Sequence, residues 1–147
     1  MMRLKWKLGM QSDWPGPYFV SATRFTYRSL RTMPLVYWHG LKLRRSWPAV
    51  DGAVGLSIMS DLATRTTYTV SVWRSEAVLL AWVRSSAHAR LMRAFRARLR
   101  SSAADSWQTD HFELRQAWRE AMRRVGLPQG DRKMDGASKA PQTGAVE

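Results

Sequence analysis

The order in which strand-like and helix-like patterns follow one another constrains the fold of this chain most. Residues 18–27 and 65–73 are rich in aromatic and β-branched residues, and 65–73 alternates Tyr68, Val70 and Val72 with polar neighbours, which predicts two strands. Further strands are expected at 53–62 and 104–110, and helices at 33–47, 76–100 and 111–125. The order β-α-β-β-α-β with a C-terminal helix predicts an α+β, ferredoxin-like fold, in which helices pack on one antiparallel sheet.

Short links and breaks set the limits of these elements. The link at Ala63 and Thr64 favours an antiparallel hairpin. Ser85 and Ser86 interrupt the long helical stretch, so we expect a bend or two helical pieces there. Residues 1–17 end in Trp-Pro-Gly-Pro and are expected to form an irregular lead-in. Residues 126–147, rich in Gly, Pro and small polar residues, are expected to form a disordered tail, which leaves one domain over 18–125.

The second face of the predicted sheet needs a cover. A second copy of the chain can supply it and join two sheets into a dimeric α/β barrel, whereas in other arrangements a lid helix covers a monomer. We favour the homodimer.

Charge and composition limit the classes of function. The chain has 24 Lys and Arg against 11 Asp and Glu, a net charge of +13, and no cysteine. Disulfides, zinc-thiolate sites and thiol nucleophiles are therefore excluded, and we expect a cytoplasmic protein. The charge favours nucleic acid, anionic lipid or an acidic small molecule, or else forms only a solvated surface. Nucleic acid is disfavoured because residues 65–73 lack the pattern of RNA-recognition sheets, and peripheral membrane contact stays open.

A single histidine, His88, heads a narrow apolar stripe on the long helix. At about 100° per residue, Met92, Phe95 and Leu99 fall on its side, while Arg90 and the arginines after it fall opposite. His88 therefore faces the sheet or a pocket beside it. It is either a buried neutral imidazole bonded to the backbone, a ligand of haem iron, or a general acid or base.

The other histidines are weaker candidates: His39 lies in the first helix, and His111 near the start of the last. The chain has no His-x-x-x-His, His-Glu-x-x-His or carboxylate-histidine cluster, so a non-haem metal site is not expected.

The stretch TYTVSVWRSEAVLLAWVRSSAHARLMRAFRAR resembles the strand-helix signature of the dimeric α/β-barrel, monooxygenase-like superfamily. FVSATRFTYRSLRTMPLVYW resembles the first strand and helix of the same group. The spheroidene-monooxygenase-like branch is the nearest, with a domain family of unknown function and the antibiotic-biosynthesis-monooxygenase groups further off. The resemblance spans about residues 18–125 and is most specific over 65–100.

The resemblance implies a ferredoxin-like fold, usually dimeric. Such proteins include cofactor-free oxygenases of polycyclic substrates, haem-binding oxygenases, and ring-forming or isomerising enzymes of secondary metabolism. His88 matches a histidine that ligates haem iron in some relatives, and Trp73 a strand-end tryptophan with a catalytic or a packing role. Arg24 matches a strand-one arginine that would bind an anionic substrate group or a haem propionate, or pair with Asp61 or Glu76.

Together these observations predict a monooxygenase-like tailoring enzyme acting on a hydrophobic polycyclic or polyene substrate, with or without haem. A cyclase or isomerase of the same fold and a non-enzymatic binder of small ligands are the alternatives. The expected catalytic residues are His88, Arg24 and Trp73. The expected substrate-binding residues are Phe25, Tyr27, Tyr37, Trp38, Met59, Trp82 and Met92.

Overall fold

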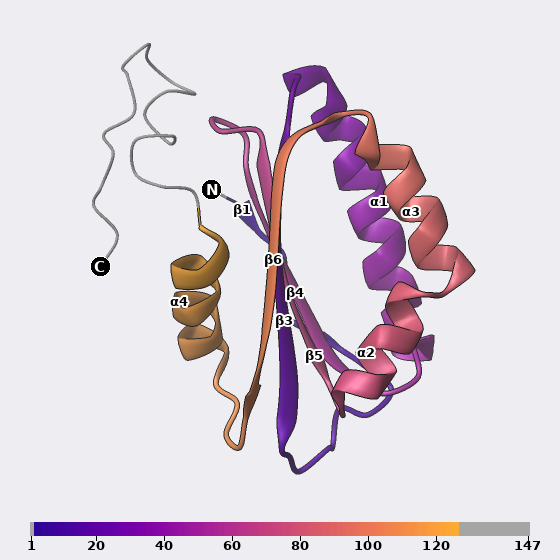
Figure 1. Cartoon of the computed structure of the whole chain (residues 1–147), viewed down its shortest axis with the longest axis vertical. Helices are drawn as coiled ribbons and strands as arrows, with labels where there is room; N and C mark the ends of the chain where they lie inside the picture. Colours follow the sequence, from indigo (N-terminus) through magenta and orange to yellow (C-terminus); the bar gives the residue numbers. More distant parts are fainter. Residues whose placement is uncertain (1, 127–147) are drawn as a thin grey trace.

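The computed structural model describes residues 2–126 and contains one six-stranded antiparallel sheet (Figure 1). The strands are β1 (Met2–Arg3), β2 (Lys7–Leu8), β3 (Tyr18–Tyr27), β4 (Ala53–Asp61), β5 (Thr66–Trp73) and β6 (Leu99–Thr109). The helices are α1 (Met33–Ser46), α2 (Glu76–Val83), α3 (Ser86–Arg96) and α4 (Leu114–Val125), with 3-10 turns at Leu30–Thr32 and Trp47–Ala49. The sheet order is β1-β4-β5-β3-β6, and β2 also pairs with β4.

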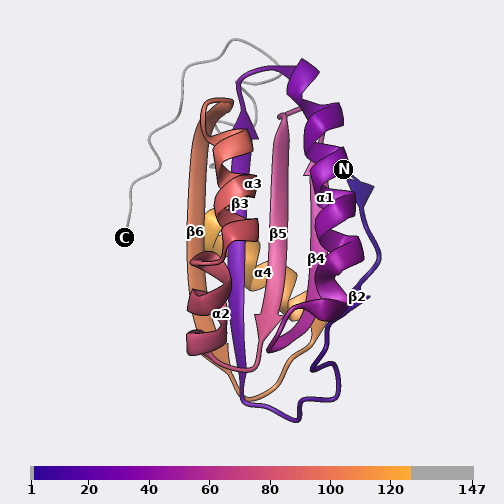
Figure 2. The same cartoon turned by 90° about the vertical axis from the view of Figure 1, so that its right-hand side faces the viewer.

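Helices cover both faces of the sheet. α1, α2 and α3 lie on one face, here called the front face, and α4 lies on the opposite, back face (Figures 1 and 2). β3 sits between β5 and β6 and is antiparallel to both, and β4 and β5 form the expected hairpin. This arrangement confirms the predicted α+β, ferredoxin-like fold. α4 supplies a cover for the back face within one chain, while the homodimer stays a prediction.

In the back-face core, α4 presents mostly small side chains to the sheet. Ala117, Ala121 and Val125 of α4 pack against strand residues such as Val20 and Val70. Small residues let the helix backbone approach the strands closely, because little side-chain volume stands between them. Trp118 fills the remaining space, and its indole Nε1 donates a hydrogen bond of 3.1 Å to the Ser57 hydroxyl. A helix and a sheet are thus joined through a fully buried polar contact.

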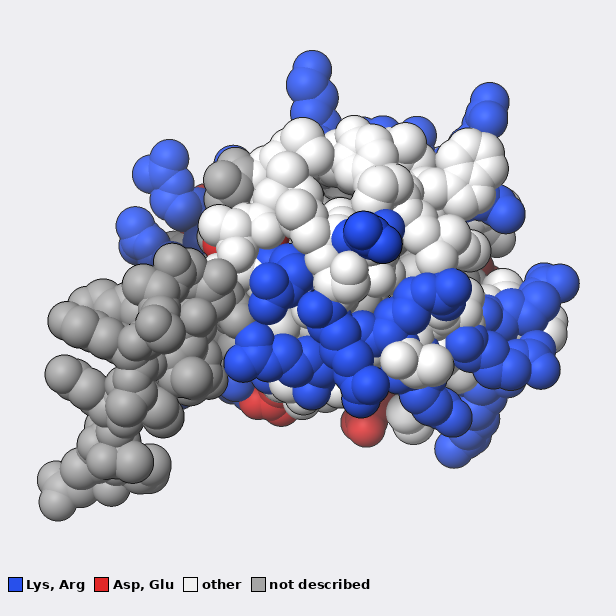
Figure 3. Space-filling view, turned by 90° about the horizontal axis from the view of Figure 1, so that it is seen from above, with Lys and Arg blue, Asp and Glu red and all other residues white. Residues whose placement is uncertain are grey.

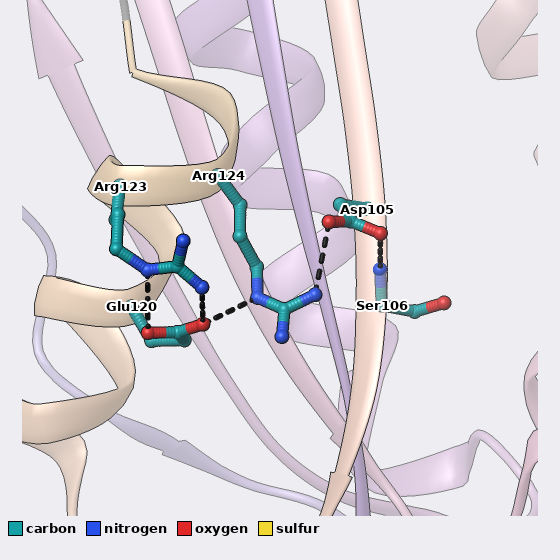
Figure 4. A network of polar contacts seen from close by, with 5 residues as sticks. All are labelled: Asp105, Ser106, Glu120, Arg123 and Arg124. Carbon is teal, nitrogen blue, oxygen red and sulfur yellow. Dashed lines mark hydrogen bonds and ion pairs between the residues drawn. The ribbon is translucent and has the colours of Figure 1, made fainter. Parts of the chain in front are cut away.

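A network of ion pairs also connects α4 to β6, the edge strand (Figure 4). The Arg124 guanidinium lies 2.9 Å from the Asp105 carboxylate of β6 and 2.6 Å from Glu120 one turn back, and Arg123 pairs with Glu120 as well. Hydrogen bonds from Arg123 and Arg124 lower the pKa of Glu120 to about 2. Arg124 also lies over the Trp107 ring, 4.7 Å from its centroid.

Three ends of elements differ by more than one residue from the sequence-based expectation. α3 ends at Arg96, before the helix end expected near 100, so that Leu99 belongs to β6 and not to the helical stripe of His88. β6 begins five residues before the strand expected at 104–110, because β3 offers hydrogen-bond partners that residues 99–103 take up. The last helix begins at Leu114 instead of 111. Its N-cap is Glu113, whose carboxylate accepts from the backbone amides of Arg115 and Gln116.

The lead-in expected to be irregular contains β1 and β2, which pair with β4. Trp6 lies between these two strands, and its ring occupies the space over Gly55, where a Cβ would sit 1.7 Å from a ring carbon. The absence of a side chain at Gly55 therefore lets Trp6 pack onto the sheet. The tail expected at 126–147 lies outside the described residues, except for Gly126.

The long helical stretch is broken into two pieces, as Ser85 and Ser86 predicted. Ser75 caps α2, and Ser85 caps α3 by accepting from the His88 amide at 3.3 Å. No helix within residues 2–126 has the length and apolar character needed to traverse a bilayer.

Candidate functional site

A cleft runs between α1 and α3 above the front face of the sheet. Leu43 of α1 and Leu91 of α3 wall three adjoining hollows of about 60, 110 and 450 Å³. We call these the upper chamber, the lower chamber and the mouth. Tyr27, Val36 and Phe95 line the upper chamber, and the lower chamber lies towards α2. The mouth opens to solvent between the two helices.

Three tryptophans from three elements build the lower chamber. Trp47 follows α1, Trp73 ends β5, and Trp82 belongs to α2. The Trp47 ring centroid lies 5.1 Å from that of Trp73 and 6.3 Å from that of Trp82. Trp47 is almost wholly buried, and within the described part of the chain its indole N–H has no hydrogen-bond partner. A buried donor without a partner is costly, so an acceptor atom of a bound molecule would stabilise this position.

His88 lines the lower chamber, where its imidazole meets Trp82 edge-on at 5.9 Å between centroids. Burial lowers the pKa of His88 below its ordinary value of 6.5, and a hydrogen bond to the backbone of Val83 partly opposes this. This lowered pKa favours the neutral form of the ring. Since the bond to Val83 engages one nitrogen, the other carries a lone pair that can accept a proton.

His39, a weaker candidate than His88 on the sequence, also borders the cleft. It lines the upper chamber and the mouth from α1, and its ring lies edge-on to Phe95 at 5.1 Å. Val36, His39 and Leu43 recur at spacings of three and four, which is the signal that places them on one helix face. Two imidazoles from facing helices therefore border the same cleft.

Most of the predicted site residues meet in this cleft. Phe25 lines both chambers, and burial raises the pKa of the Tyr27 hydroxyl well above its usual value. Trp73 is fully buried, and its indole Nε1 donates a 2.9 Å hydrogen bond to the Ser71 hydroxyl. The remaining members are Tyr37 in the upper chamber, Met92 and His88 in the lower chamber, and Trp82 in the lower chamber and the mouth.

Three predicted residues lie elsewhere. Arg24 alternates with Phe25 along β3, so it shares the back face with Val20 and Ala22. Met59 packs against the α4 core for the same reason. Trp38 is 59% exposed on the outer side of α1, with Lys42 Nζ 6.0 Å from its ring centroid.

Arg24 also lacks the ion pair that was considered for it. It is nine-tenths buried, its Nε has no hydrogen-bond partner, and within residues 2–126 it pairs with neither Asp61 nor Glu76. Arg24 therefore does not act together with His88 in this cleft.

The described residues contain no cluster of three or more His, Asp or Glu side chains able to hold a metal ion. Haem needs only a single axial ligand, so the space beside His88 decides whether this residue can ligate its iron. A macrocycle must lie directly against its ligating imidazole, and drug-sized ligands already need about 300–1,000 Å³. The lower chamber offers about 110 Å³, with the Trp82 ring beside the imidazole. The residues around His88 therefore do not fit a haem.

Solved structures provide the similarity that sequence comparison does not. No protein-family model and no curated protein matches the sequence. A heme-degrading enzyme from Listeria monocytogenes matches with a TM-score of 0.60 and 14% identity, covering 73% of this chain and 69% of that one. A monooxygenase-like protein from Listeria innocua matches with a TM-score of 0.57 and 15% identity, covering 76% and 64%.

A conserved protein from Methanosarcina mazei matches with a TM-score of 0.57 and 9% identity, covering 63% of this chain and 93% of that one. Further matches carry names of the antibiotic biosynthesis monooxygenase group. At such identities the similarity lies in the architecture of the chain. The chain therefore shares the ferredoxin-like fold of these proteins.

Proposed function

We propose that the chain is a monooxygenase-like enzyme that binds a hydrophobic, polycyclic or polyene molecule in the cleft. The placement of the His88 imidazole in a chamber walled by aromatic rings, edge-on to Trp82, is the single observation that carries this proposal. A flat apolar molecule would insert its reacting end into the lower chamber and leave the rest in the mouth. Trp47, Trp73 and Trp82 would stack on it, and the Trp47 N–H would meet an oxygen atom of the ligand.

The chemistry that suits this arrangement starts with proton abstraction. The free ring nitrogen of His88 would take a proton from a carbon made acidic by neighbouring aromatic rings, which leaves a delocalised carbanion. Dioxygen would then accept the electrons, so that an activated CH₂ group and O₂ become a carbonyl group and water. Exclusion of water by the aromatic walls protects the carbanion from reprotonation. Every group invoked on the protein side belongs to the described cleft.

The haem-dependent version of this function is disfavoured by the space around His88, and no step above passes through a haem. It is tested separately by adding hemin to the purified protein. A Soret band that His88→Gln removes would establish ligation by this imidazole and replace the cofactor-free scheme.

A cyclase or isomerase is the second candidate function, and the pair of histidines favours it. His39 and His88 border adjoining parts of one cleft from facing helices, so one imidazole would donate a proton while the other accepts one. Such a reaction consumes no dioxygen. Oxygen uptake therefore separates the two functions.

The experiment uses anthrone, a tricyclic ketone with one activated CH₂ group, as the probe. Binding is followed by quenching of tryptophan fluorescence, and turnover by an oxygen electrode. Removing a general base costs about 10²- to 10⁴-fold in rate, which is the loss expected for His88→Gln. His111→Gln is the matched control, because His111 lies on the back side near α4, away from the cleft.

Three results would contradict the oxygenase proposal. Quenching of the tryptophan fluorescence without any turnover would indicate a protein that binds the ligand without converting it. Turnover without oxygen uptake would favour the isomerase. Equal rates for the wild type and His88→Gln would remove the imidazole from the mechanism.

A further inference from the structure

Three connections meet at one end of the molecule, far from α2. They are the β3–α1 link, the β4–β5 turn and the α3–β6 link, which lie together at the top of Figure 1. Backbone hydrogen bonds join them: the Arg28 amide donates to the Arg98 carbonyl at 3.0 Å, and the Tyr27 amide donates to the Arg65 carbonyl at 2.9 Å. The three connections therefore lie next to one another at this end of the molecule.

Positive charge gathers on this surface. Arg28, Arg31, Arg96 and Arg98 are all exposed, and Figure 3 shows a band of Lys and Arg across this end. Arg28 and Arg98 donate only to backbone carbonyls, which leaves their charge uncompensated. Over residues 2–126, none of the four guanidiniums takes part in an ion pair. Across segments 24–32, 58–68 and 93–103, Asp61 is the only acidic residue. We call these four arginines the arginine band.

An apolar groove of about 400 Å³ lies at the same end. Leu30 and Leu62, from two of the three connections, are 56% and 59% exposed, and Met2 is 48% exposed. The other lining residues are Met33, Pro34, Val36, Tyr37 and Ser60. Leu30 is the neighbour of Arg31 in the chain. Aliphatic side chains and unpaired guanidiniums therefore share one surface.

We infer that this end of the molecule docks onto a membrane surface that contains anionic lipid. The arginine band would lie at the phosphate level, where each basic residue contributes attraction to the negatively charged leaflet. Leu30, Leu62 and Met2 would enter the boundary between headgroups and acyl chains, which removes their apolar surface from water. A single-stranded nucleic acid would instead need a row of aromatic rings for stacking, and among residues 2–126 Tyr37 is the only aromatic residue lining this groove.

The groove also adjoins the cleft. Val36, Tyr37 and Ser60 line both the groove and the upper chamber. A lipophilic molecule leaving the membrane would thus pass from the groove past Tyr37 towards the chambers. This use of the groove rests on the proposed function, whereas the docking surface does not.

The test is co-sedimentation of the full chain with vesicles of phosphatidylcholine alone and of an equal mixture of phosphatidylcholine and phosphatidylglycerol. The wild type is expected to bind the mixed vesicles only. The double variant Arg31→Glu with Arg96→Glu should weaken that binding at least about tenfold, because each basic residue near an anionic surface contributes about 1 kcal/mol of attraction. Arg115→Glu with Arg119→Glu, two exposed arginines of α4, makes the same change in net charge and should leave binding unchanged. Circular dichroism verifies that each variant is folded.

The contribution of the apolar side chains to membrane binding is tested with the double variant Leu30→Ser, Leu62→Ser. This pair should abolish the binding that persists at high salt, where the attraction between charges is screened. Anthrone turnover in solution should be the same in the arginine variant as in the wild type, so failure of docking and failure of the proposed function are distinguishable.

Several results would overturn the inference. One is absence of wild-type binding to the mixed vesicles, and another is equal loss in the two arginine pairs. A third is preference for a single-stranded RNA over the vesicles, with no effect of the leucine substitutions, which would assign the band to nucleic acid.

Discussion

On the back face of the sheet the alanines of one helix lie against the strands and buried rings such as Trp118 and Tyr68 pack beside them, whereas on the front face three tryptophans leave a chamber between the helices and the strands. Ala117 and Ala121 bring α4 close to β3, and the Trp118 indole finds a partner in Ser57. On the front face Trp47, Trp73 and Trp82 interlock but leave a chamber, and one indole N–H stays without a partner within residues 2–126. The back face is thus organised for stability, and the front face keeps space that a ligand can fill.

The largest expected effect comes from truncating one tryptophan on each face. Trp118→Ala should lower the free energy of unfolding by about 3–5 kcal/mol, since it empties a buried site and leaves Ser57 unpaired. Trp82→Ala should cost clearly less, because Trp82 is only partly buried, yet it should abolish quenching by anthrone. Urea unfolding measures both losses. Equal losses in stability would break the comparison between the two faces.

A second pair of variants adds atoms instead of removing them. Ala121→Leu should destabilise the protein by about 1–3 kcal/mol, because Ala121 is almost wholly buried against the strands and a larger side chain there would overpack the core. Gly40→Ala in α1 should stabilise it by up to about 1 kcal/mol through helix propensity. A Cβ at Gly40 would meet only Ile58 Cδ1 at 3.9 Å, an ordinary contact. Thermal unfolding of the two variants checks both signs, and a loss for Gly40→Ala would show that the front face is tightly packed.

The pH dependence of His88 gives a smaller effect. The pKa of His88 is lowered in the folded state, so the unfolded chain binds the proton more readily. Stability from the neutral ring is therefore present above pH 6.5 and declines as the pH falls through 6.5 towards the folded-state pKa. Titration of the imidazole signals by NMR should give His88 a midpoint below 6.5, with His88→Gln identifying the signal. A midpoint above 6.5 would mean that the ring is not in an apolar chamber.

The smallest effect is expected at the network of ion pairs on the back face. Since the pKa of Glu120 is lowered to about 2 from 4.5, its contribution to stability is present above pH 4.5 and is lost between 4.5 and 2. Glu120→Gln should remove this part of the acid sensitivity and change stability near pH 7 only slightly, because the ion pairs of Glu120 lie at the surface and are partly screened by solvent. Acid unfolding followed by circular dichroism compares the variant with the wild type. An identical acid transition in the two proteins would contradict the assignment.

The elements that the sequence predicted well are those with a repeating pattern of their own. β3 and β5 alternate side chains between two buried faces, and their limits agree with the expectation within one residue. The first half of β6 could not be recognised, because Arg100, Ser101 and Ser102 are exposed and carry no apolar alternation. Its strand conformation comes from pairing with β3, a contact distant in the sequence.

The sequence predicted which side chains line the cleft where those side chains share one face of a helix. The stripe of His88 and Met92 does line the cleft, since residues four apart share a face. Arg24 and Phe25 were both assigned to the site, although neighbours on a strand point to opposite faces and only one of them can line it. Met59 and Trp38 were also assigned to the site, whereas the structure places their neighbours Ile58 and His39 at the cleft. Which face carries the cleft depends on where α4 packs, and no local pattern encodes that.

The break between α2 and α3 has a consequence for ligand size. α2 is held by its Ser75 cap and by Trp82 within the tryptophan cluster, whereas α3 begins anew at its own serine cap. A jointed helix can pivot about Arg84 and Ser85 without losing the hydrogen bonds inside either segment. We therefore expect the range of ligand sizes that the cleft can bind to depend on this break between α2 and α3 as much as on the side chains that contact the ligand.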